Sequence, residues 1–378
     1  MIVPKYFYVI IGGGLAGLQL ARQLSRDVFF KGKKIAVIDS DFSLPVKTWC
    51  FWEKGSGKWD ELMTKSWKKG KFISSEDNID LSLSPYNYKM INSAKYHQDL
   101  QKEIEQSGDI VFITDEIKEI DPVTMKAKGD KDTYSATHFF DSRVDPSYLE
   151  SKKHNTIFQH FKGWEVETKE PVFNPDSFTM MDYRIKYPEA TAFTYILPFT
   201  ETKALVEYTF FTPFLTEDKV YDEMLQKYFQ NILKTKDFEI KSTEAGVIPM
   251  TDFPFDKSNS RKITKIGTGG GWVKPSTGYS FKNTEKRIAK IIENIKSGKL
   301  PGENLINKKF RKYDAIFLDV LAQNNHKGEA IFSKFYTKNT PQDIFKYLDE
   351  ETSVSEDIKI MLSLNNFDFV KSFFRKCL

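Results

Sequence analysis

Cysteine is scarce in this sequence, since only Cys50 and Cys377 occur among 378 residues. The first apolar stretch contains Lys5 and runs directly into glycines, so it does not have the form of a secretory leader. Few cysteines and no leader favour a reducing, cytoplasmic location. Nothing near Cys50 in the sequence activates its thiol, and we expect it to be a small packing residue.

Long apolar runs are missing as well. No uncharged stretch of about 18 or more apolar residues occurs, which is the length expected of a membrane-spanning helix. The five histidines show no metal-ligand spacing, so we expect no metal site. The net charge of +4, from 56 basic and 52 acidic residues, is too small and dispersed to predict nucleic-acid binding, although it is compatible with an anionic surface.

Aromatic residues, in contrast, are abundant. They make up 15% of the chain, with 32 Phe and 17 Tyr, although the mean hydropathy is −0.47. We therefore expect much of the aromatic surface to line an internal space. The length of 378 residues exceeds what one hydrophobic core usually organises, which predicts two interleaved domains or one two-lobed unit.

The N-terminal segment carries the clearest local signal. An apolar strand is predicted over residues 6–11, followed by glycines in G-x-G-x-x-G spacing, a helix, and a second apolar strand that ends in Asp39. Such glycines let the backbone approach a pyrophosphate at a helix N-terminus, and the acid accepts a hydrogen bond from a ribose hydroxyl. The pattern predicts a bound FAD or NAD; the alternative is a glycine turn that only packs helix on strand. The residues expected at the nucleotide are Gly12, Gly14, Leu15, Ala16, Gly17 and Asp39.

The order of the later segments favours FAD over a nicotinamide. No helix follows Asp39 at once, as it would in a compact dehydrogenase. A strand and a small β-meander end at Asp141, and a long β-rich insertion follows. Residues 262–295 then supply a strand, a glycine turn and a long helix after Pro275. This order resembles the large two-domain flavoproteins, in which a sheet domain interrupts the FAD domain and covers the flavin ring.

The fold class predicted from this order is α/β. We expect a Rossmann-like FAD-binding domain of the hydroxylase and reductase type, an inserted β-sheet substrate domain, and a helical C-terminal cap. The expected boundaries are 1–70, 88–145 and 241–297 for the split FAD-binding domain, 71–87 and 146–240 for the substrate domain, and 298–378 for the helical region.

Within the insertion, "TAFTYILPF" and "KALVEYTFF" read as a hairpin joined by the polar turn "TETK". Alternation in the second strand places Leu205, Glu207, Thr209 and Phe211 on one face and Val206, Tyr208 and Phe210 on the other. Glu207 therefore has no charged neighbour on its face of this strand. If that face is covered, desolvation raises the pKa of Glu207 and keeps it protonated near neutral pH. The alternative is an edge strand with Glu207 in water.

The segment "KTWCFWE", residues 47–53, places large apolar side chains where a solvated loop is expected. This loop follows the strand that ends in Asp39. We therefore predict that Trp49, Phe51 and Trp52 fold over the flavin and form part of an apolar wall for the substrate. The alternative is that they only fill the joint between the two lobes.

Several segments spread from residue 10 to residue 364 carry a family resemblance. They include "IIGGGLAGLQLARQL", "KTWCFWE", "ALVEYT", "EAGVIPMTDFPF", "KPSTGYSF" and "DEETSVSEDIKIMLSL". Together they resemble the FAD-dependent bacterial lycopene cyclases. The resemblance implies closure of β-ionone rings at the ends of linear lycopene or a related acyclic carotenoid, giving γ- or β-carotene, as an isomerase without net redox change. It also implies reduced FAD as the cofactor and NAD(P)H as the reductant.

The same resemblance implies roles for individual residues. The acidic motif of the family falls on "VEYT", so the proton-handling carboxylate is expected at Glu207, and the second, often acidic, position is Tyr208. The turn that commonly contains Asp in related flavoproteins reads Gly267, Thr268, Gly269, so backbone amides are expected to replace that carboxylate. Further cofactor contacts are expected from Lys47, Thr48, Trp49, Ile117, Gly269, Pro275, Thr277, Gly278 and Tyr279, and substrate contacts from Trp49, Phe51, Trp52, Leu205, Thr209 and Phe211.

The expected chemistry starts with protonation of a terminal alkene, followed by attack of the neighbouring double bond and loss of a ring proton. A carboxylic acid kept neutral by an apolar cover suits the first step, and anionic reduced flavin with aromatic faces suits the cation. Two other classes share these features. One is a flavin-dependent monooxygenase or oxidoreductase acting on a hydrophobic polyene or isoprenoid, and the other is a non-catalytic flavoprotein that binds polyenes or lipids.

Lycopene is insoluble in water, so the resemblance implies a protein that is peripheral on the inner face of the cell membrane. The C-terminal segment 365–378 mixes Phe and Val with Lys and Arg, as an interfacial helix does, with core packing as the alternative. Upstream, Thr340 before Pro341 is a helix-start signal.

Overall fold

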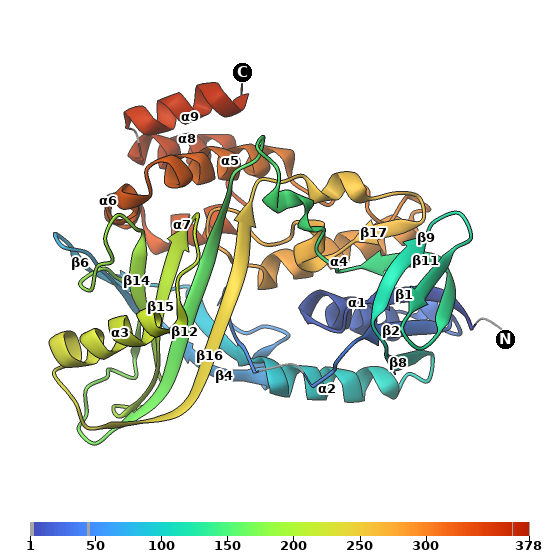
Figure 1. Ribbon diagram of the computed structural model, residues 1–378, viewed down its shortest axis with the longest axis horizontal. Coiled ribbons are helices and arrows are strands. Elements are labelled where there is room, and N and C mark those ends of the chain that lie inside the picture. Colours follow the sequence, from blue (N-terminus) through green and yellow to red (C-terminus); the bar gives the residue numbers. More distant parts are fainter. Residues whose placement is uncertain (1–3, 44–45, 365, 378) are drawn as a thin grey trace.

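Two lobes make up the molecule (Figure 1). The computed structural model describes residues 4–43, 46–364 and 366–377. The nucleotide-type lobe contains a seven-stranded sheet in the order β8-β2-β1-β11-β10-β9, with β17 paired to β11. Its parallel strands are β1 (Lys5–Ile11), β2 (Ile35–Asp39), β8 (Ile110–Thr114), β11 (Thr133–Asp141) and β17 (Ile263–Lys265), and its antiparallel meander consists of β9 (Ile117–Asp121), β10 (Lys126–Gly129) and β11.

Strand β1 is covered on both faces, which explains its continuous apolar sequence. Tyr8 and Ile10 face the core formed with α1 (Leu15–Arg26), α2 (Ser93–Glu105) and α4 (Phe281–Lys296). Val9 and Ile11 face the core beneath the meander. The strand, glycine turn, helix and strand predicted at the N-terminus are therefore present in that order.

The second lobe is built on another seven-stranded sheet, in the order β16-β12-β15-β14-β13-β5-β6. The predicted hairpin is present as two antiparallel strands of this sheet. Helix α3 (Asp218–Tyr228) covers the outer face, while the inner face packs toward the C-terminal helices. The strands are β5 (Lys69–Ile73), β6 (Asn78–Ser82), β12 (Thr156–Thr168), β13 (Ser177–Asp182), β14 (Ala192–Pro198), β15 (Lys203–Thr212) and β16 (Phe238–Thr251).

The second sheet extends farther along the chain than the sequence indicated. Strand β16 pairs with β12 from Phe238 to Thr251, so residues 241–251 belong to this sheet and not to the nucleotide-binding unit. The boundary expected at residue 240 is wrong for a physical reason. β16 is a partly exposed edge strand whose partner lies far away in the sequence, and such pairing leaves no local pattern.

The aromatic segment is a strand and not the expected loop. β3 (Thr48–Lys54) pairs with β7 (Tyr86–Asn92), which also pairs with β4 (Met63–Trp67), in a third sheet. Alternation along β3 sends Phe51 into the core of the nucleotide-type lobe and Trp52 into the core of the second lobe. The sheet therefore joins the lobes, and both of its aromatic faces are covered.

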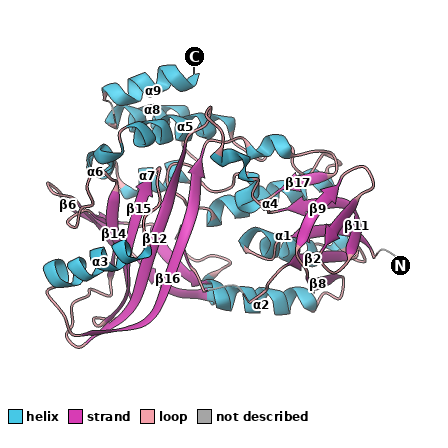
Figure 2. Ribbon diagram, in the orientation of Figure 1, coloured by secondary structure: helices cyan, strands magenta, loops and turns pink. Residues whose placement is uncertain are grey.

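The C-terminal region is helical, as predicted, and Figure 2 shows its helices grouped beside the second sheet. The hydroxyl of Thr340 accepts the N–H of Asp343 at 3.2 Å, and Pro341 occupies the first turn, so this helix starts where the sequence predicts. The helices are α5 (Lys308–Gln323), α6 (Gly328–Lys338), α7 (Pro341–Leu348), α8 (Val354–Ser363) and α9 (Phe367–Cys377).

Candidate functional site

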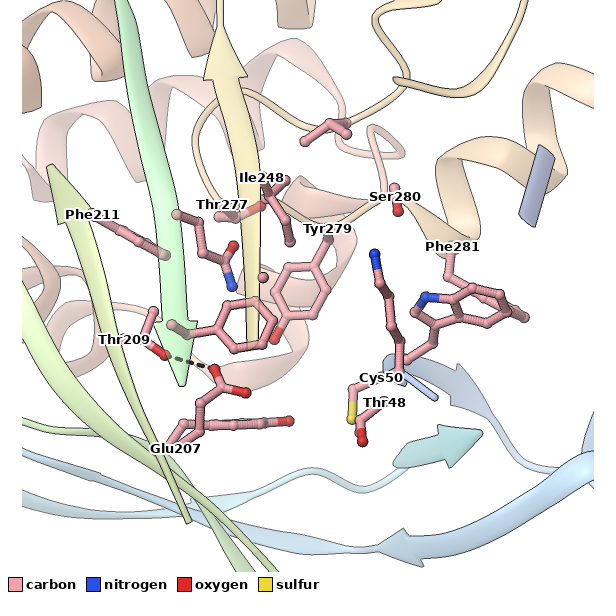
Figure 3. A pocket seen from close by; sticks show the side chains of 18 of the residues that line it. Thr48, Cys50, Glu207, Thr209, Phe211, Ile248, Thr277, Tyr279, Ser280 and Phe281 are labelled. Atoms are coloured by element: carbon pink, nitrogen blue, oxygen red, sulfur yellow. Dashed lines mark hydrogen bonds between the residues drawn. The ribbon is translucent and has the colours of Figure 1, made fainter. Parts of the chain in front are cut away.

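A cavity of about 590 Å³ lies where the lobes meet. Its wall includes residues from the start of α1, from β3, from the inner face of β15 and β16, from the turn before α4, and from α6. Figure 3 shows Glu207 and Thr209 entering from β15, with Thr48 and Cys50 of β3 on the other side and Tyr279 between them. The cavity thus connects the glycine turn to the predicted acid.

The glycine turn is shaped for close backbone approach. Gly12 has a φ of +102°, and a Cβ on Gly17 would lie 1.9 Å from the carbonyl oxygen of Gly12. A Cβ on Gly14, by contrast, would have no neighbouring atom of the described residues within 4 Å, so the space beside this glycine is open. It precedes the first turn of α1 without a side-chain cap, so the amides at this helix start remain available to an anion.

Asp39 ends β2 beside this turn. Its Oδ2 accepts the N–H of Gly13 at 2.5 Å, and its Oδ1 accepts the N–H of Asp41 at 3.2 Å. The carboxylate remains partly exposed. The strand end, the turn and the acid therefore lie together as the sequence predicts.

Not every predicted cofactor residue reaches the cavity. Leu15, Lys47, Thr48, Trp49, Thr277, Gly278 and Tyr279 line it, together with Gly14 and Thr268. Ala16 and Gly17 lie in or beneath the first turn of α1.

Ile117, Gly269 and Pro275 lie away from the cavity lining. Ile117 is buried in the core beneath the meander, and its carbonyl accepts a hydrogen bond of 2.8 Å from Nη1 of Arg143. Gly269 packs on the backbone of Arg143, and Pro275 borders a separate small hollow. A cofactor contact at these three positions was predicted by family resemblance, and the packing does not bring them to the cavity.

The predicted substrate wall is also only partly assembled. Trp49, Thr209 and Phe211 line the cavity. Phe51 instead stacks on Phe281, with ring centroids 4.5 Å apart, and Trp52 stacks on Phe345, with centroids 4.6 Å apart. These two side chains therefore pack the joint between the lobes, which is the alternative that the sequence left open.

Leu205 is likewise a core residue and does not reach the cavity. It lies in the core of the second lobe, and one of its methyl groups, Cδ1, lies 3.0 Å from the ideal Cβ position of Gly163.

Glu207 occupies the predicted inner face of β15 and is 6% exposed. Its Oε1 accepts a hydrogen bond of 2.6 Å from the hydroxyl of Thr209. Burial raises the pKa of Glu207 to about 8, and the nearby carboxyl of Glu244 adds to the increase. The side chain is therefore shielded from bulk water and not on an exposed edge, as the alternative required.

Glu244 was missed in the sequence. Gly163 of β12 is paired with Glu207 on one side and with Glu244 on the other, so the two carboxyls flank a position without a side chain. Oε2 of Glu244 accepts a hydrogen bond of 2.8 Å from the hydroxyl of Thr48. Burial raises the pKa of Glu244, while the hydrogen bonds from Thr48 and the charge of Lys47 oppose that increase.

Three residues that line the cavity each contain a buried polar atom without a partner among the described residues. Nε2 of His97, Oε1 of Gln159 and Oγ1 of Thr277 are buried and have no hydrogen-bond partner within the described part of the chain. Gly278 has a φ of +76°, and a Cβ there would lie 1.8 Å from Oε1 of Gln159. Buried polar groups normally find partners, so this set indicates a polar ligand.

Tyrosines form the wall beside Glu207. The hydroxyl of Tyr88 lies 2.9 Å from that of Tyr195 and 2.8 Å from that of Tyr279. Burial raises the pKa of Cys50 to about 12, so its thiol is a packing group at neutral pH, as predicted. Aromatic faces and hydroxyl groups therefore surround the acid.

The sequence profile of the family described as lycopene cyclase protein matches residues 8–376, nearly the whole chain. The chain belongs to the lycopene cyclase family. No curated protein matches it significantly. The resemblance seen in the sequence is thus confirmed at the level of the family.

Solved structures show the same fold at low identity. A geranylgeranyl bacteriochlorophyll reductase-like protein from Thermoplasma acidophilum is 13% identical, with a TM-score of 0.59 over 100% of this chain and 97% of that chain. A triple mutant of a flavin-dependent brominase is 14% identical, with a TM-score of 0.63 over 98% and 100%. A flavoprotein/dehydrogenase from Cytophaga hutchinsonii is 12% identical, with a TM-score of 0.59 over 94% and 99%. These similarities confirm the predicted fold class.

Proposed function

We propose that this lycopene cyclase family member closes β-ionone rings at the ends of linear lycopene, giving γ- and then β-carotene without net redox change. The observation that carries the proposal is Glu207, a buried carboxyl with a raised pKa on the wall of an aromatic cavity. An alkene is a weak base, so its protonation needs a strong acid shielded from water.

FAD fits the opposite end of the cavity. The open space at Gly14 and the free amides of α1 suit a pyrophosphate, and Asp39 suits a ribose hydroxyl. The unpartnered polar atoms of His97, Gln159 and Thr277 suit the donors and acceptors of a ribityl chain and flavin ring. When bound in its reduced form, with NAD(P)H as the reductant, FAD supplies negative charge beside the developing carbocation.

The chain itself supplies the proton and the apolar walls. Glu207 donates its proton to the terminal alkene, and Thr209 fixes the direction of the carboxyl through its hydrogen bond. Trp49, Phe211 and Tyr195 present aromatic surface to the same space. Each cation–π contact is worth about 0.5–2 kcal/mol, so several faces together stabilise a tertiary cation while offering it no nucleophile.

A lipid bilayer is the proposed source of the substrate. Among the described residues, no helix is both long and apolar enough to cross a membrane. Helix α9 packs on α5, yet it exposes Phe367 at 70% and Phe374 at 57%. Val370 and Phe373 are also exposed there, and α8 adds Ile358 and Leu362.

Exposed basic groups accompany this apolar surface. Lys371 lies over the ring of Phe367 at 4.4 Å. Arg375 forms an ion pair with Asp319 but is still 47% exposed. An apolar face with basic side chains suits the interface of an anionic membrane. We therefore propose that α8 and α9 rest on the cytoplasmic leaflet of the cell membrane.

One experiment tests the activity. The purified protein, loaded with FAD and reduced without oxygen, is incubated with lycopene in liposomes, and the pigment is identified by chromatography and absorbance. Cyclic carotenoid formed under anaerobic conditions, with no net consumption of NAD(P)H, supports the cyclase.

The fold similarity to a flavin-dependent brominase keeps an oxidative reaction as the second candidate. Product that forms only with oxygen, in proportion to NAD(P)H consumed, supports that reaction instead. Bound polyene that is recovered unchanged supports a binding protein.

A further inference from the structure

We propose that Glu244 is the second catalytic residue of this site, the carboxylate that accepts the ring proton after Glu207 has donated one. The inference rests on the proposed cyclisation and deepens it. Ring closure adds one proton and removes another from a different carbon, so the site needs a base as well as an acid.

The sheet geometry brings the two carboxyls to one wall. Glu207, Gly163 and Glu244 are paired across β15, β12 and β16, so the two glutamates stand about 10 Å apart at their Cα atoms, or two strand spacings. An ideal Cβ on Gly163 would lie 3.5 Å from Cβ of Glu207 and 3.5 Å from Cγ of Glu244. Both side chains line the cavity. Gly163 contributes no side chain between them, and the nearest other group is Cδ1 of Leu205, 3.0 Å from that ideal Cβ.

Burial raises the pKa of both carboxyls, but their polar contacts differ. Glu207 accepts one hydroxyl hydrogen bond and is more deeply buried, so it keeps its proton at neutral pH. Glu244 accepts hydrogen bonds from Thr48 and lies near Lys47, and both contacts favour the ionised form. Two neighbouring carboxyls with different environments commonly act as an acid and a base.

Other ionisable groups near the pair do not take either role. Glu207 faces Tyr195 on β14 and lies near Cys50 and Tyr279, whose pKa values burial raises to well above neutrality. Glu165 on β12 lies near Glu244 on the same face of the sheet, but its side chain is exposed and does not line the cavity. Glu244 is therefore the available base at this wall.

The proton balance closes without an oxidant. The O–H bond of Glu207 breaks as a C–H bond forms on the terminal alkene, and the next double bond attacks the cation. A ring C–H bond then breaks, its electrons form the ring double bond, and the proton passes to Glu244. Transfer of that proton from Glu244 to Glu207 past Gly163, directly or through water, restores the starting state.

The test compares Glu244→Gln with Glu239→Gln in flavin-loaded protein and lycopene liposomes. Both substitutions lie on β16, but Glu239 is 72% exposed and distant from the cavity. We expect Glu239→Gln to match the wild type, and Glu244→Gln to lose about 10²–10⁴ in ring formation while retaining flavin. We also expect a larger share of end groups with the double bond at another ring position, because proton loss is no longer directed.

Chemical rescue separates a base from a structural residue. Glu244→Ala should regain ring formation when formate is added, and Glu244→Gln, which leaves no space, should not. Unchanged rates and ring types in Glu244→Gln, or no rescue of Glu244→Ala, overturn the assignment. If the wild type forms no rings, the proposed function itself fails, so the two failures are distinguishable.

A second variant decides the case if both substitutions prevent flavin binding. Thr48→Val removes the hydroxyl that favours ionised Glu244, so the pKa of Glu244 rises. The acid side of the pH–rate profile should then move to higher pH. An unchanged acid side overturns the inference.

Discussion

The hydroxyl of Thr209 donates a hydrogen bond of 2.6 Å to Oε1 of Glu207 on the same face of β15. This contact alone lowers the pKa of Glu207, but burial outweighs it and the pKa rises to about 8. Thr209 thus orients the carboxyl, while burial keeps it protonated. That combination is what a proton donor requires.

Replacement of Glu207 by Gln should abolish most ring formation. The amide keeps the shape of the side chain but cannot donate a proton of comparable acidity, so we expect a loss of about 10²–10⁴ in rate. FAD should be retained, because the substitution leaves the glycine turn and Asp39 unchanged. Pigment analysis after anaerobic incubation measures the effect, and wild-type rates would remove the general-acid role.

The rate should also depend on pH in the direction set by Glu207. Its folded-state pKa is raised to about 8, so the proton is present below that pH and is lost as the pH rises through it. We expect the rate to fall on the alkaline side with a midpoint near pH 8. Thr209→Val should move that midpoint upward, because it removes a hydrogen bond that lowers the pKa. A profile with no alkaline loss in this range would contradict the assignment.

Two glycine substitutions should separate cofactor binding from folding. Gly17→Ala forces a Cβ to within 1.9 Å of the Gly12 carbonyl, so we expect the protein without FAD to lose about 1–3 kcal/mol of stability. Gly14→Ala meets open space and should cost less stability, only that of a poorer N-cap for α1, but it obstructs the space where the pyrophosphate is expected. A weakening of FAD binding by about tenfold or more is expected there. Thermal unfolding and flavin titration measure the two effects, and equal FAD affinity in Gly14→Ala would argue against this site.

Trp52→Ala should act on stability. The indole is 3% exposed and stacked on Phe345, so truncation is expected to cost about 3–5 kcal/mol in the free energy of unfolding. Trp49→Ala should instead reduce ring formation at smaller cost, since Trp49 is only partly buried and lines the cavity. Denaturant unfolding and turnover of the two variants provide the comparison. If both variants lost stability and turnover to the same extent, the assignment of Trp52 to the joint between the lobes and of Trp49 to the cavity wall would be wrong.

Membrane binding should depend on α9. A Phe373→Asp and Phe374→Asp double variant removes exposed apolar surface and adds charge, so binding to anionic liposomes is expected to fall by more than about tenfold in sedimentation assays. Turnover of detergent-dispersed lycopene should remain. Val123→Asp is a matched control, because Val123 is 82% exposed on the β9–β10 turn of the nucleotide-type lobe. If the double variant bound liposomes as well as the wild type, the protein would contact the membrane through a surface other than α9.

The sequence predicted those structural features that depend on residues close to one another in the chain. Gly12, Gly14 and Gly17 between two apolar strands specify a strand, turn and helix, and alternation around Glu207 specifies which side chains share its face. The cap of α7 at Thr340 is equally local. Each of these features depends on residues within a few positions of one another.

Features that depend on distant pairing were not visible in the sequence. Glu244 meets Glu207 only because β16 and β15 pair with opposite edges of β12 around Gly163. The aromatic strand β3 was mistaken for a loop, because coverage of Phe51 and Trp52 comes from Phe281 and Phe345, far along the chain. When a side chain is buried by segments far away in the sequence, the residues around that side chain show no pattern that predicts its burial.

The volume of the cavity sets a limit on how a long substrate is handled. About 590 Å³ is the size of a pocket for one drug-sized molecule, and the cavity also extends to the glycine turn. Only one tip of a forty-carbon polyene fits beside a cofactor there, and the remainder must stay outside. Under the proposed function, each pigment molecule therefore has to withdraw and turn end over end before its other terminus reacts, and singly cyclised pigment should appear before the bicyclic product.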